Sequence, residues 1–221
     1  MLKKIIFIIL LTNMANNNID KPINYQDDDV SHIQEKANLD IDWSLIEKLE
    51  GNEIFGHQPS ANSGVTIGSG FDLKEKTESS LKDMGFDPDL IDKLKPYLGL
   101  TGDEAAAVVS DKNKDLKNLV LSSEETSRLN KLSKKHYTED IKNQYEEGTG
   151  KKFWKLSPEQ QTIVMSVGYQ YGNLKTRTPK FWKGVINDDW EGVVNELNNF
   201  GDEHDTRREE EAEYLSASLY K

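Results

Sequence analysis

The chain has 221 residues, no cysteine, and 39 acidic against 28 basic side chains, which gives a formal net charge of −11. This length suits one globular domain with a short appendage. The lack of cysteine excludes disulfides and thiolate chemistry, and the negative charge argues against binding of nucleic acid. The four histidines do not have the spacing of a metal site, so we expect neither a metal nor a cofactor.

The first residues have the features of an export signal. Two lysines precede an apolar run from Ile5 to Leu11, which is shorter than the roughly 20 residues of a membrane span. We expect a signal peptide over residues 1–15 and a periplasmic or secreted protein, without a stable membrane span and tethered only while this segment is retained. Residues 16–39 are polar and acidic, as in a linker, so residues 40–221 should form the folded domain.

Capping motifs and apolar spacing predict mostly helices in this domain. Ser157 begins a capping box that is completed by Gln160, apolar residues then recur at helical spacing, and Gly172 follows as a stop. The same pattern recurs at Ser122, with Glu125 three residues later, and at Thr101, with Glu104. Shorter helices are expected at about 43–50, 181–186, 190–197 and 206–219.

The pattern changes between Asn52 and Asp72. Four glycines and one proline disfavour a helix there, and an alternating run at Val65 to Ile67 favours short strands. The sequence therefore predicts an α+β domain that is predominantly α, with a small glycine-rich β-hairpin after the first helix and a multi-helix lobe.

Candidate chemistry is concentrated where the first helix meets the hairpin. Glu50 ends the helix, while Thr66 and Asp72 lie in the glycine-rich segment. Two carboxylates and a bound water can hydrolyse a glycosidic bond, because one acid protonates the leaving oxygen and the other group activates the water. Taken singly, such residues are more often solvated charges or helix caps.

Together these residues resemble a known family. Glu50-Gly51 and the segment GVTIGSGFDL at 64–73 are similar to the active-site hairpin of phage-type lysozymes, in particular the muramidase-toxin branch that contains pesticin. Residues 157–172 resemble the central helix of that superfamily, and residues 207–215 resemble its C-terminal R-R-x-x-E-A-x-x-L helix. The resemblance implies a lysozyme-like fold and a peptidoglycan hydrolase.

The hairpin departs from that of phage lysozymes. Those usually carry an aspartate between the glutamate and the threonine, but residues 54–65 contain no acidic residue. The pesticin-like pattern instead has its aspartate six residues after the threonine, and a phenylalanine replaces a common histidine. The resemblance therefore implies Glu50, Thr66 and Asp72 as catalytic residues, with Glu53 as the rival acid.

In the implied reaction, Glu50 protonates the oxygen between two amino sugars, while Thr66 and Asp72 hold and deprotonate a water on the opposite face. An arginine of the C-terminal lobe orients the glutamate in this family, and Arg207 or Arg208 is the candidate. Substrate contact is also predicted near the end of the central helix and in the C-terminal helix, at Tyr169, Gln170, Asn173 and Arg207.

Three other functions remain open from sequence. A lytic transglycosylase would need the glutamate but no group that activates water, so Thr66 and Asp72 favour hydrolysis. A chitinase-like enzyme would use the same glutamate chemistry. A non-catalytic glycan-binding or structural module would need none of the three residues.

The expected partner is the glycan strand of peptidoglycan, with a cognate inhibitor or immunity protein besides, and we expect a monomer. Charge is unevenly distributed, because residues 112–183 contain 15 basic and 8 acidic side chains despite the acidic total. This basic region could face the anionic cell wall, in which case activity should fall as salt rises.

Overall fold

The computed structural model describes residues 39–109 and 119–219. The predicted signal peptide and residues 16–38 of the predicted linker lie outside these described residues. Among the residues that the structure describes, no helix is long and apolar enough to cross a membrane.

The first half of the described chain combines short helices with a small antiparallel sheet in the order β1-β2-β3. Its elements in chain order are α3 (Trp43–Glu50), β1 (Glu53–His57), β2 (Thr66–Gly68), β3 (Phe71–Asp72), α4 (Glu78–Asp83), α5 (Pro88–Leu94), the 3-10 helix η1 (Lys95–Tyr97) and α6 (Gly102–Val109). The predicted hairpin is therefore part of a three-stranded sheet.

The second half is helical. Its elements are α7 (Ser123–Thr149), the 3-10 helix η2 (Phe153–Lys155), α8 (Pro158–Tyr171), α9 (Leu174–Arg177), α10 (Pro179–Ile186), α11 (Trp190–Leu197) and α12 (Asp205–Leu219). The predominantly α, α+β, lysozyme-like fold class is confirmed. The length of α7 was not predicted, because its 27 residues are mostly polar and few of them are buried.

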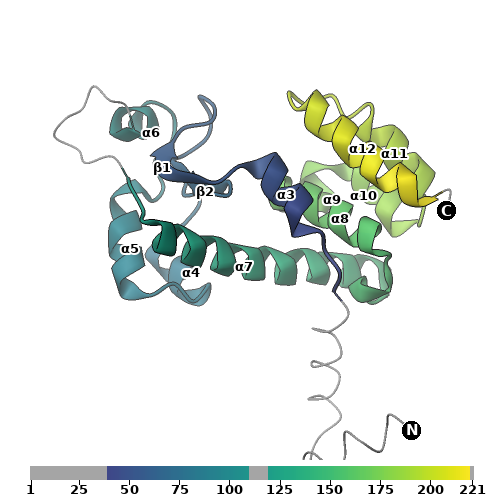
Figure 1. The fold of residues 1–221 in the computed structure, drawn as a ribbon, viewed down its shortest axis with the longest axis horizontal. Coiled ribbons are helices and arrows are strands. Elements are labelled where there is room, and N and C mark those ends of the chain that lie inside the picture. The colour runs from purple at the N-terminus through teal and green to yellow at the C-terminus, as the bar shows by residue number, and fades with distance from the viewer. Residues whose placement is uncertain (1–38, 110–118, 220–221) are drawn as a thin grey trace, which may run out of the picture. The chain divides into compact units, whose positions relative to one another are not determined.

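Two hydrophobic clusters form the core, and α7 connects them (Figure 1). The sheet cluster contains Ile67 and Phe71 with residues of α4 and α5, and α7 contributes Leu129 to it. The helix cluster gathers α3 and α8–α12, and α7 contributes Ile141 to it. Because Leu129 and Ile141 belong to different clusters, the two ends of α7 pack in different cores. Tyr137, between them, packs against both clusters.

The capping boxes predicted at Ser122 and Ser157 are present. Ser122 Oγ accepts from the N–H of Glu125 at 3.2 Å, and the Glu125 carboxylate accepts from the N–H of Ser122 at 2.9 Å. Ser157 and Gln160 repeat this exchange at the start of α8. Because such caps contribute about 1 kcal/mol each, local sequence fixes where the two central helices begin.

Helices α7 and α8 approach each other closely at Gly168 and Ile141. A Cβ atom at Gly168 would lie 2.4 Å from Ile141 Cδ1, so Gly168→Val should overpack this contact. We expect the free energy of unfolding, measured in urea, to fall by about 1–3 kcal/mol. Adding Ile141→Val, which removes Cδ1, should recover part of this loss, and an additive loss in the double variant would contradict the steric explanation.

Candidate active site

Glu50 is the last residue of α3, and both ends of this helix are fixed. Asp42 Oδ1 accepts hydrogen bonds from the N–H of Ser44 at 3.0 Å and of Leu45 at 3.3 Å, which satisfies donors at the helix start. Gly51 follows with a φ of +72°, a conformation that favours glycine. The chain therefore turns directly after Glu50, whose side chain is only 12% exposed.

Thr66 and Asp72 face the same side of the sheet. They are register partners across β2 and β3, and directly opposed residues in antiparallel strands lie on one face. Asp72 Oδ1 accepts from the N–H of Lys74 at 2.8 Å, and its Oδ2 accepts from the N–H of Gly64 at 3.4 Å. Backbone donors thus hold the Asp72 carboxylate beside the threonine. His57 of β1 is the other register partner of Thr66.

The turn between β2 and β3 lies against Glu50. Gly70 in this turn has a φ of +75°, and a Cβ atom there would lie 2.5 Å from Glu50 Oε2. Only glycine allows both the backbone conformation and this close approach. The fold therefore brings the carboxylate of Glu50 to the hairpin that carries Thr66 and Asp72.

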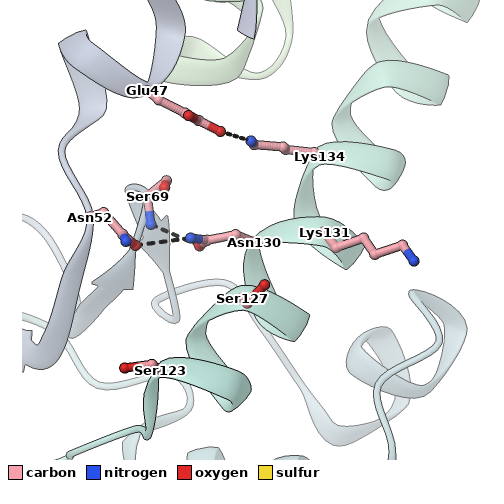
Figure 2. Close-up of a pocket in the computed structure, with 8 residues that line it drawn as sticks. All are labelled: Glu47, Asn52, Ser69, Ser123, Ser127, Asn130, Lys131 and Lys134. Carbon is pink, nitrogen blue, oxygen red and sulfur yellow. Dashed lines mark hydrogen bonds and ion pairs between the residues drawn. The ribbon is translucent and has the colours of Figure 1, made fainter. Parts of the chain in front are cut away.

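Helix α7 braces the same turn from another side, as Figure 2 shows. The Asn130 amide accepts from the N–H of Ser69 at 2.9 Å and donates to Asn52 Oδ1 at 2.9 Å. An ion pair between Lys134 and Glu47 ties α7 to α3 one turn before Glu50. These residues line a polar pocket of about 460 Å³. The position of the turn relative to α3 is thus set by α7.

Arg207 of α12 contacts the other oxygen of Glu50. Its Nη2 lies 2.7 Å from Glu50 Oε1, and both side chains are nearly buried. Arg207 also donates to the backbone oxygen and to Oγ of Ser166, both at 3.2 Å. Burial lowers the pKa of Arg207, but Glu50 and Glu211 more than offset this and raise it above its usual value. Arg207 is therefore a permanent cation that fixes the orientation of Glu50.

Arg208 points elsewhere, although it is the neighbouring residue. Its guanidinium pairs with Glu211 through Nη1, contacts Gln170 through Nη2 and lies 3.3 Å from Asp202 Oδ2 through Nε. The side chain is 2% exposed. Of the two arginines left open by the sequence, the structure thus assigns the contact with Glu50 to Arg207.

A groove of about 440 Å³ lies between residues of the sheet region and residues of α7 and α8. Asp72 and Lys76 line it from the sheet side, Tyr137 from α7, and Tyr169 and Gln170 from α8. The groove thus receives residues from both halves of the fold, with the Asp72 carboxylate on its wall. Its polar and aromatic lining suits a hydrated, hydroxyl-rich ligand such as a sugar.

Burial controls the ionisation of three groups on this wall. It raises the pKa of Tyr137 to about 12, with Asp72 and Glu50 adding to the effect, and it also raises the pKa of Tyr169. Both phenols are therefore neutral at physiological pH. Burial likewise lowers the pKa of Lys76, whose ammonium lies 5.5 Å from the ring centre of Phe71 and 5.8 Å from that of Tyr137.

Several predicted residues are not on the groove wall. Glu50 and Thr66 do not line it, and Thr66 is 5% exposed. Asn173 does not line it, because its Oδ1 caps α9 by accepting from the N–H of Thr176 at 3.0 Å. Glu53, the rival acid, is an exposed residue of β1 paired in register with Gly68. The structure thus gathers Glu50 and Arg207, rather than Glu53, at the turn.

Sequence reasoning missed the supporting contacts. Ser166 and Glu211 stand within the two helical motifs that resemble the lysozyme superfamily, so those motifs were the available signal. Nothing in the local sequence distinguishes Asn130 from other polar residues of α7. Among the described residues, no three histidine, aspartate or glutamate side chains gather as metal ligands.

Comparison with known proteins identifies the family. Residues 40–191 match the Pesticin family, described as a bacterial toxin homologue of phage lysozyme, C-terminal part. The chain belongs to the pesticin family. No curated protein matches it. The pesticin match covers α3, the sheet and α8 but ends before α12, so the contact between Arg207 and Glu50 lies partly outside the matched residues.

The approach of Gly70 to Glu50 can be tested with a matched pair of glycines. Gly70→Ala should reduce hydrolysis of purified peptidoglycan by at least tenfold, because the new methyl group displaces either Glu50 or the turn. Gly99 has the same φ of +75° but open space around its Cβ position, so Gly99→Ala carries similar backbone strain, about 1–2 kcal/mol, without this contact. Equal losses of activity in the two variants would contradict the prediction.

Proposed function

We propose that this pesticin family member is a muramidase that hydrolyses the β-1,4 bond between N-acetylmuramic acid and N-acetylglucosamine in peptidoglycan. The observation that carries the proposal is the position of Glu50: Arg207 holds it against the hairpin on which Thr66 and Asp72 face each other. The substrate lies outside the cytoplasm, which agrees with the export expected from residues 1–15.

Glu50 serves as the general acid. It donates its proton to the bridging oxygen as the glycosidic bond breaks, so that the leaving sugar departs as an alcohol. Contact with Arg207 on Oε1 and with the turn at Gly70 on Oε2 restricts the carboxyl group to one orientation. A restricted acid loses less entropy on reaching the transition state.

Asp72 and Thr66 serve the attacking water. Each Asp72 oxygen accepts one backbone N–H, from Lys74 or Gly64, and a carboxylate oxygen has a second lone pair to accept a proton from water. The Thr66 hydroxyl, on the same face, can orient that water. Deprotonation by Asp72 lets the water oxygen bond to the anomeric carbon as Glu50 protonates the leaving oxygen.

The role of Glu50 is tested by a conservative variant with a matched control. Glu50→Gln keeps the size of the side chain but cannot donate the acid proton, so activity on purified peptidoglycan should fall by about 10²–10⁴-fold. Glu53→Gln makes the same change three residues away, on an exposed side chain, and should retain parental activity. A fully active Glu50→Gln enzyme, or an inactive Glu53→Gln enzyme, would refute the assignment.

The products separate hydrolysis from the competing reactions. Mass spectrometry of digested peptidoglycan should show new reducing ends rather than 1,6-anhydro sugars, because Asp72 delivers a water to the anomeric carbon. Asp72→Asn should lower the rate while leaving the binding of glycan intact. Predominantly anhydro products would favour a lytic transglycosylase, and faster cleavage of chitin oligomers than of peptidoglycan would favour a chitinase-like enzyme.

A further inference from the structure

A buried cluster of charges extends behind Arg207. Glu211 is fully buried, and its Oε1 accepts from Arg207 Nε at 3.2 Å and from Ser166 Oγ at 2.5 Å. Its second oxygen pairs with Arg208. One carboxylate thus bridges two neighbouring arginines of α12, and only the first of them contacts Glu50.

Asp202 closes the outer end of the cluster. Its Oδ2 lies 3.3 Å from Arg208 Nε and accepts from the Tyr171 hydroxyl at 2.5 Å. Burial raises the pKa of Asp202, but the hydrogen bond from Tyr171, that from the N–H of His204 and the charge of Arg208 together lower it below its usual value. Asp202 is therefore ionised at physiological pH.

The charges of this cluster cancel without Glu50. Arg207 and Arg208 supply two positive charges, and Glu211 and Asp202 supply two negative ones. The four side chains are between 0 and 15% exposed, so their interactions are weakly screened by solvent. Glu50 is the fifth member, and the whole set is neutral only when Glu50 carries a proton. Arg207 therefore does not require an ionised Glu50 as its counter-charge.

The other groups that face Glu50 add no net positive charge. Tyr137 of α7 and Tyr169 of α8 are neutral, as shown above. Asp72 of β3 is a further negative charge, which disfavours a second carboxylate nearby. Lys134 of α7 is already paired with Glu47 of α3.

We propose that Glu211 and Asp202 are positioning residues for catalysis, because they neutralise the two arginines of α12 and so let Arg207 orient Glu50 without removing its proton. This inference rests on the proposed role of Glu50 as general acid. It assigns a chemical reason to the buried carboxylates behind the site: they supply the negative charges that balance the two arginines.

The test is the pH dependence of peptidoglycan hydrolysis in variants that change the cluster charge with opposite signs. Asp202→Asn removes a negative charge and favours ionised Glu50, so the alkaline limb of the profile should move to lower pH, by on the order of 1 unit. Arg208→Gln removes a positive charge and should move the same limb to higher pH. Glu209→Gln, an exposed position on the same helix, should leave the limb in place.

The outcomes separate the possible roles. Shifts of opposite sign support the proposal, whereas a loss of activity by one factor at every pH, with no shift, shows a purely structural cluster and overturns it. Circular dichroism checks that each variant folds; if Arg208→Gln does not fold, the sign of the Asp202→Asn shift decides alone. Failure of the proposed function would show differently, as parental activity in Glu50→Gln.

Discussion

The ion pair between Arg207 and Glu50 is the interaction on which the site depends. It joins the end of the first described helix to the start of the last one, 157 positions further along the chain. Two further contacts run in parallel with it, between Lys48 and Glu210 at 2.6 Å and between Asp42 and Tyr214 at 3.3 Å. These outer contacts are more exposed and contribute little by themselves, but they place α12 where Arg207 can reach the carboxyl group.

The hairpin and α7 supply the opposite constraint. Glu50 has arginine on one oxygen and a glycine turn against the other, while Asn130 of α7 fixes that turn by accepting from the N–H of Ser69. The acid is thus held from two independent directions. Such double restraint suits the proposed role of Glu50 as an acid, because the turn that supplies one contact is itself fixed by Asn130 of α7.

Much of the fold follows from local sequence. The capping boxes at Ser122 and Ser157 and the glycine-rich segment determine where helices begin and where the chain turns, and these signals act over a few residues. The 27-residue length of α7 could not be predicted in this way, because its polar surface carries no strong apolar stripe and its few buried residues are shared between two cores.

The residues of the site show the same contrast between local signals and long-range packing. Thr66 and Asp72 could be found from one motif because they are six residues apart, whereas the choice between Arg207 and Arg208 depends on which face of α12 meets α3. Both arginines are largely buried and both contact Glu211, so neither burial nor charge distinguishes them. Only the packing of α12 against α3 distinguishes the two arginines.

The long separation between α3 and α12 also bears on when the site is completed during synthesis of the chain. Contacts between residues far apart in sequence form only after both partners exist, and domains fold as units while the chain is made from its N-terminus. Helix α12 follows every other helix of the described chain, so a nascent chain can build the hairpin and the long α7 while its acid is still unoriented. If Glu50 has the proposed role, a ribosome-bound chain lacks an oriented general acid until the last described helix emerges and docks.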